Sequence, residues 1–178
     1  NTHDKDGASA LQLTVKNQHT DCTRLLLAAG AQLDPSLLDL INAEGSAHQT
    51  RENDARLLQA AEQGDAAALK ERLTAGAPAD SLGAYKRPAL QIAARGGHAE
   101  CVQLLLSHGA DITRTNDNGD TALHEAARNG HTACVQHLLA AKAPVDAADC
   151  GVTPLYEAAR LNHLDIVNLL LSAGANPN

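Results

Sequence analysis

Residues 121–143 read TALHEAARNGHTACVQHLLAAKA, and two short helices account for this pattern. The run 124–129 predicts a first helix that Gly130 ends, and His131 and Thr132 open a second one. In the second helix, apolar side chains recur with the 3.6-residue period that places them on one face. They are Cys134, Val135, Leu138 and Leu139. Because helices this short are not stable alone, each pair must be buried against a neighbouring pair.

The same pattern recurs along the chain. Residues 88–110 read PALQIAARGGHAECVQLLLSHGA and residues 153–175 read TPLYEAARLNHLDIVNLLLSAGA. Residues 9–31, SALQLTVKNQHTDCTRLLLAAGA, are a fourth copy, and residues 55–77, ARLLQAAEQGDAAALKERLTAGA, are a fifth and weaker one. A glycine closes the second helix at matching points, as expected for a left-handed residue after a helix end. These glycines are Gly30, Gly76, Gly109 and Gly174. Self-similarity at a period of 32 to 33 residues predicts a stack of repeats.

The unit resembles the ankyrin repeat. The residues that carry the resemblance are Gly119–His124 (GDTALH), Gly151–Tyr156 (GVTPLY), Gly97-His98, Gly130-His131 and Gly109–Asp111. The resemblance covers nearly the whole chain except about 35–50. It implies an all-α ankyrin-repeat solenoid of stacked helix–turn–helix units joined by β-turn fingers. It also implies recognition of a partner protein through the fingers and the first helices, which line the concave face.

Three units depart from the pattern. Lys86 replaces the finger glycine and Pro88 replaces the threonine, so we expect an irregular finger in the unit at 83–110. Lys142 replaces the glycine that ends a second helix, which puts that helix end in doubt. Arg72 stands where the other units have a leucine, namely Leu26, Leu105, Leu138 and Leu170.

The domain organisation changes near residue 50. Residues 52–77 resemble a capping repeat, because they lack a finger and Arg72 would face water at the edge of an array. We therefore predict one repeat and a following short helix over 1–45, a linker or irregular joint over 46–51, and an array of four units over 52–178. The alternative is one continuous stack, in which Arg72 would need a buried partner. Since the chain starts with Asn1 and a unit ends at Asn178, we expect it to be a piece of a longer protein.

Composition argues against several classes of function. The formal net charge of −7 and the two tyrosines, without Phe or Trp, argue against a nucleic-acid binder, which needs a basic surface or stacking aromatics. No apolar run approaches the ~20 residues that span a bilayer, so we expect no membrane insertion.

No enzyme, cofactor or metal motif is apparent. Four of the nine histidines (His19, His98, His131 and His163) occupy one repeat position, and equivalent positions of a stack cannot converge on one metal ion. In the family, the position of His124 hydrogen-bonds the neighbouring turn. The cysteines form no CxxC pair, which favours a reducing compartment, the cytoplasm or the nucleus. Bacterial effectors also use this repeat, so delivery into a host cell is a second hypothesis.

The candidate partner-binding residues lie on the first helices and the fingers. Arg95, Arg128 and Arg160 are equivalent, and Glu125 and Glu157 each precede their arginine by three residues. This pattern fits a pair that only solvates the helix and fits equally a charged row that meets an acidic or mixed-charge partner. The fingers add Tyr85, Arg87, Asp117, Asn118, Asp120, Asp149 and Val152. Tyr85 is the best single anchor, since Tyr is a favoured hot-spot residue.

We therefore predict a non-enzymatic interaction module, a scaffold or adaptor that binds another protein or peptide, with no preference for any oligomeric state. The alternative is a regulatory or substrate-recognition region of a larger enzyme, ubiquitin ligase or channel. Small-molecule binding ranks last because Tyr85 and Tyr156 are the only aromatic platforms.

Overall fold

The structure is a computed structural model that describes residues 52–148 and 151–178. The chain divides into two compact units, 1–51 and 52–178, and only the second is described. It starts with a helix over 52–63 and continues with α4 (Ala66–Thr74), the short 3₁₀ helix η1 (Ala84–Lys86), α5 (Ala89–Gly96) and α6 (Ala99–Ser107). The remaining helices are α7 (Ala122–Arg128), α8 (Thr132–Ala140), α9 (Pro154–Arg160) and α10 (Leu164–Ser172).

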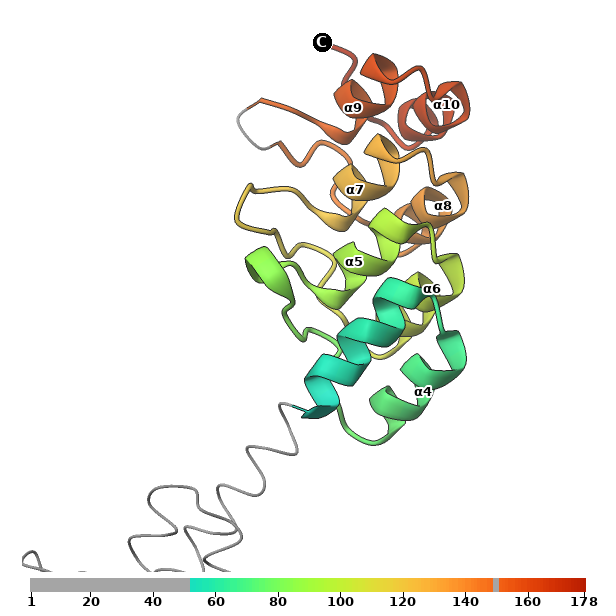
Figure 1. The fold of residues 1–178 in the computed structure, drawn as a ribbon. Helices are drawn as coiled ribbons and strands as arrows, with labels where there is room; N and C mark the ends of the chain where they lie inside the picture. The colour runs from blue at the N-terminus through green and yellow to red at the C-terminus, as the bar shows by residue number, and fades with distance from the viewer. Residues whose placement is uncertain (1–51, 149–150) are drawn as a thin grey trace, which may run out of the picture. The chain divides into compact units, whose positions relative to one another are not determined.

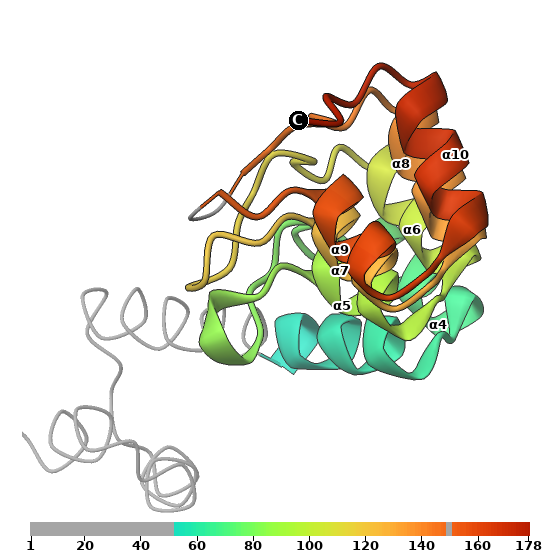
Figure 2. The ribbon, with the colours of Figure 1, turned by 90° about the horizontal axis from the view of Figure 1, so that it is seen from above.

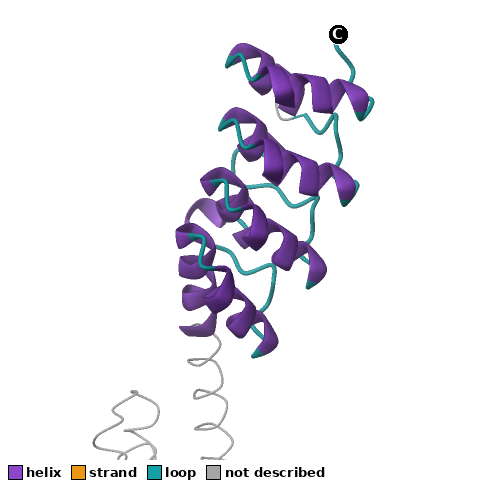
Figure 3. Cartoon of the chain, turned by 90° about the vertical axis from the view of Figure 1, so that its right-hand side faces the viewer, coloured by secondary structure: helices purple, strands orange, loops and turns teal. Residues whose placement is uncertain are grey.

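Apart from η1, these helices form four antiparallel pairs, the first of which consists of the helix over 52–63 and α4. The pairs stack in chain order (Figure 1, Figure 3). The first helices α5, α7 and α9 pack on one another, and the second helices α4, α6, α8 and α10 form the neighbouring layer. Viewed along the stack, the fingers extend away from both helix layers on the side of the first helices (Figure 2). The expected all-α stack of helix–turn–helix units is confirmed.

Small side chains make up most of the core between the two layers. Ala93, Ala94, Ala126 and Ala127 of the first helices are fully buried, as are Cys134, Val135 and Leu138 of the second. Alanine lets neighbouring first helices approach closely, while the leucines fill the wider space between the layers. Leu139, the fourth residue of the predicted stripe, is half-buried.

The helix ends follow the sequence signals with small differences. Helix α7 begins at Ala122, two residues before the predicted start, because Thr121 caps it and its N–H donates to His124 Nδ1 at 3.1 Å. Lys142 takes the left-handed conformation expected of glycine, with φ 64°, so α8 ends like its neighbours despite the substitution.

The finger of the α5 unit is a short hairpin. Leu82 and Pro88 form an antiparallel bridge, and the Arg87 N–H donates to Ala84 O at 3.2 Å. The two central residues, Tyr85 and Lys86, both have positive φ, 57° and 49°. This combination normally calls for Asn or Gly. The predicted irregularity of this finger is therefore seen in the backbone.

Arg72 lies on α4 with its side chain 21% exposed, and it pairs with Glu71 of the same helix. This contact joins no two units. The division into an array that ends near 45 and another that starts at 52 stays a prediction, as does the short helix predicted after the first repeat, which falls outside the described residues.

Candidate partner-binding site

Three equivalent arginines lie in the last turns of α5, α7 and α9, and we call Arg95, Arg128 and Arg160 the arginine row. Because these helices pack side by side (Figure 1), the three residues follow one another along the stack. Their surroundings differ, however. Arg95 is exposed, whereas the Arg128 side chain is 31% exposed and that of Arg160 is 49% exposed.

Arg128 is held by carboxylates from two units. It donates to both oxygens of Asp120, from Nη2 to Oδ1 at 2.8 Å and from Nη1 to Oδ2 at 3.2 Å. Its Nε and Nη2 both donate to Glu157 Oε1 at 3.1 Å. Such bidentate pairs fix the plane of the guanidinium as well as its position. Arg128 therefore connects its own finger, through Asp120, with the next first helix.

Glu157 bridges two arginines of the row. One oxygen accepts from Arg128, and Oε2 accepts from Arg160 Nη2 at 2.6 Å and from its Nε at 3.2 Å. The expected pair three residues apart is therefore present in the α9 unit. In the α7 unit the corresponding pair is long, with 3.9 Å between Arg128 Nη1 and Glu125 Oε2.

This cluster determines the ionisation of its buried carboxyls. Burial by itself raises the pKa of Asp120 and of Glu157, but hydrogen bonds and charge from the arginines outweigh it and both pKa values end below their ordinary range. Hydrogen bonds to Asp120 and Glu157 raise the pKa of Arg128, and burial only partly opposes them. All three groups are therefore charged at neutral pH.

The α5 unit lacks this arrangement. Its residue equivalent to Asp120 is Arg87, whose Nε lies 3.6 Å from Glu125 Oε1 and makes no hydrogen bond within the described residues. Arg95 has no ion pair with any described side chain. The sequence predicts three equivalent arginines. In the structure, Arg128 pairs with carboxylates on two sides, Arg160 pairs with one carboxylate, and Arg95 pairs with no described side chain.

The fingers differ in what they expose. Tyr85 is 75% exposed, and the neighbouring Lys86 pairs with Asp117 of the next finger at 3.2 Å. Asn118 is also exposed, while its N–H donates to Asn116 Oδ1. Val152 is half-buried. Asp149 lies outside the described residues.

Three of the predicted contact residues are buried. Asp120, Glu125 and Glu157 are only 4–6% exposed. Their carboxylates lie against the arginines, so within this cluster they position the arginine side chains. Direct contact of these three carboxylates with a partner stays a prediction.

The repeated histidines join neighbouring units. Nε2 of His98, His131 and His163 donates to a backbone carbonyl of the preceding first helix, at Glu62, Arg95 and Arg128 respectively, over 3.0 to 3.2 Å. His124 Nε2 donates to Val152 O of the next finger at 3.1 Å, as the family resemblance implies. Each histidine makes a separate structural contact. Among the residues that the structure describes, no group of three or more His, Cys, Asp or Glu side chains is placed to hold a metal.

The two described cysteines are buried core residues. Burial raises the pKa of Cys101, and burial together with the neighbouring Cys101 raises that of Cys134 to about 11. Both thiols are therefore protonated and unreactive at neutral pH, as expected of cysteines that pack as small hydrophobic residues.

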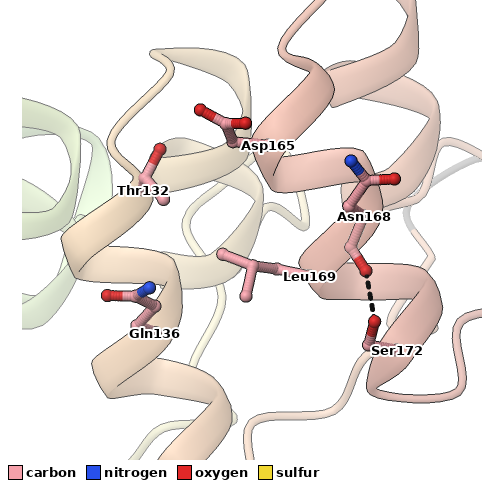
Figure 4. A pocket seen from close by; sticks show the side chains of 6 residues that line it. All are labelled: Thr132, Gln136, Asp165, Asn168, Leu169 and Ser172. Carbon is pink, nitrogen blue, oxygen red and sulfur yellow. Dashed lines mark hydrogen bonds between the residues drawn. The ribbon is translucent and has the colours of Figure 1, made fainter.

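A hollow of about 330 Å³ lies between α8 and α10 (Figure 4), and none of the arginine row lines it. It is lined by Thr132, Gln136, Asp165, Asn168, Leu169 and Ser172. Ser172 Oγ donates to Asn168 O within it. Ligand pockets are usually enclosed and mostly apolar, whereas this hollow is an open gap between two outer helices.

One exposed aromatic residue, Tyr156, is absent from the predicted partner-binding residues. Tyr156 occupies the position of the buried His124 and Gln91, yet it is 54% exposed on α9. Its larger side chain at a position of smaller hydrogen-bonding residues is the signal that identifies it. In the described part of the chain, no helix has the length and apolar character needed to cross a membrane.

Comparison with known families agrees with this architecture. The model for three consecutive ankyrin repeats matches residues 57–149 and 109–178, and the model for a single ankyrin repeat matches residues 6–39. Ankyrin repeats generally bind other proteins, and such domains are typically not catalytic. The chain therefore belongs to the ankyrin-repeat family.

Proposed function

We propose that the chain is a scaffold or adaptor module that binds a partner protein, without catalysis, through the face formed by its fingers and first helices. The supporting observation is that side chains of hot-spot type stand exposed on a rigidly held frame. Tyr85, Arg95, Tyr156 and Arg160 are exposed, and tyrosine and arginine are the residues that most often dominate interface energy.

The rigidity of the frame comes from contacts between units. Glu157 ties Arg128 to Arg160, and Arg128 ties the finger residue Asp120 to the helix behind it. Because these side chains are ordered before association, less conformational entropy is lost on binding. A partner would meet a surface whose buried carboxylates set the positions of exposed cations.

The experiment compares the proposed face with the exposed surface of the second helices α6 and α8. The full chain serves as bait in affinity capture followed by mass spectrometry, next to the double variant Tyr85→Ser/Arg95→Glu. The control is Gln103→Glu/Gln136→Glu on exposed positions of α6 and α8, which changes the net charge by the same amount. Circular dichroism checks that all three proteins keep their helices.

A protein captured by the wild type and the control, but lost with the first variant, supports the proposal. A partner that survives the first variant and is lost with the control places binding on the outer helices and contradicts it. Failure of the wild type to capture any protein above a bait-free column contradicts it as well.

A further inference from the structure

Resting on the proposed function, we infer that Arg87 and Arg95 form a subsite that receives a carboxylate side chain of the partner. The α5 and α7 units are equivalent in sequence but differ at this place. Arg87 and Arg95 lie 33 residues before Asp120 and Arg128, which contact each other bidentately. The α5 unit therefore has an arginine in the place of the anion.

The internal carboxylates do not fill this place. Glu125 is the nearest one, at 3.6 Å from Arg87 Nε and 3.9 Å from Arg128 Nη1, and both contacts are longer than a hydrogen bond. Asp120 and Glu157 are taken up by Arg128 and Arg160. The donor groups of Arg95 are thus open to an outside acceptor.

The local charge has the sign that an acidic partner requires. Arg87, Arg128 and Arg160 pair with the three carboxylates Asp120, Glu125 and Glu157. Arg95 has no such pair, so its charge is the one positive charge in excess of these pairs. The whole chain has a formal charge of −7. An acidic segment would be repelled from most of the surface and attracted here, which favours one docking position.

The nearby anions also limit the charge of the ligand. A guest between Arg87 and Arg95 lies close to the Glu125 carboxylate, so each additional negative charge adds repulsion. A singly charged Asp or Glu side chain fits this balance better than a doubly charged phosphate. Tyr85, two residues before Arg87 in the same finger, is 75% exposed and can add an apolar contact to the same partner.

The subsite is tested on the full chain by following the Nε–Hε signals of arginine by nuclear magnetic resonance. The probes are N-acetylglutamate amide, neutral N-acetylglutamine amide and inorganic phosphate, each at constant ionic strength. We expect saturable shifts at Arg95 and Arg87 with the glutamate probe alone, and no response at Arg128, whose Nε–Hε already donates to Glu157.

Arg87→Asp recreates the pair that Asp120 and Arg128 form, so Arg95 should gain an internal partner and bind the probe about tenfold more weakly. Arg87→Gln tests the same loss without adding an anion. Lys70→Asp, on an exposed position of α4, changes the net charge equally and should leave binding unaltered.

The subsite inference is overturned if Arg95 responds no more than the exposed Arg56, or if its response persists in both Arg87 variants. A stronger response to phosphate would overturn the choice of a carboxylate. Neither result bears on the capture experiment, which tests whether this face binds a protein at all.

Discussion

The α5 and α7 units share one backbone plan but treat the same arginine differently. In the α7 unit, Asp120 and Glu157 hold Arg128 from two sides. In the α5 unit, Arg87 takes the place of Asp120 and Arg95 stays exposed without an ion pair in the described chain. The residue eight positions before the arginine, Asp120 in one unit and Arg87 in the other, thus accompanies the difference between a paired and an exposed arginine.

Replacing each arginine with alanine gives the sharpest test of this comparison. Arg128→Ala leaves the nearly buried Asp120 and Glu157 with fewer partners and should lower the free energy of unfolding by about 2–3 kcal/mol. The value is at the low end for a buried pair because the Arg128 side chain is 31% exposed. Arg95→Ala should change the free energy of unfolding by less than about 0.5 kcal/mol. Urea unfolding measures both, and equal losses would mean that the two arginines are not different in kind.

The Arg128 contribution should also disappear in acid. Its carboxylate partners have pKa values lowered by folding, from ordinary values of 3.8 for Asp120 and 4.5 for Glu157. A lowered pKa in the folded state stabilises the protein above the ordinary pKa and is lost as the pH falls through the folded value. The stability gap between wild type and Arg128→Ala should therefore shrink progressively as the pH falls below about 5. A gap that stays constant over this range would show that lost packing, not charge, is responsible.

The repeat plan could be predicted from sequence because it depends on local patterns. The paired helices follow from residues repeated at one position, and the contact of His124 with the neighbouring turn follows from the family resemblance. The pairing of Arg128 could not be predicted, since Asp120 precedes it by eight residues and Glu157 belongs to another unit. The stacking of α7 on α9 brings these carboxylates together. The burial of Glu157 also depends on this stacking and could not be predicted from the sequence.

The turn between the paired helices should behave alike in both units. A Cβ at Gly97 would lie 2.6 Å from the His131 ring, and one at Gly130 would lie 2.8 Å from the His163 ring. Both glycines also have positive φ, so alanine at either should cost about 2 kcal/mol in unfolding free energy. Gly109→Ala, where the new Cβ meets nothing within 4 Å, should cost only about 1 kcal/mol. If Gly97→Ala and Gly130→Ala lost different amounts of unfolding free energy, the α5 and α7 units would differ in their helix–helix turns as well as in their fingers.

The ends of the second helices reverse the comparison, because here the α7 unit departs from the pattern. Lys142 closes α8 with φ 64°, where α6 is closed by Gly109. A residue with a side chain pays about 1–2 kcal/mol for the left-handed conformation, and glycine avoids this strain. Glycine also raises the entropy of the unfolded chain, which offsets part of the stabilisation. Lys142→Gly should therefore raise the free energy of unfolding by about 0.5 kcal/mol. Urea unfolding of this variant beside Lys70→Gly, a helix-interior control that should lose stability, separates the backbone effect from the loss of a lysine charge. A loss with Lys142→Gly would mean that the lysine side chain makes a stabilising contact that outweighs its backbone strain.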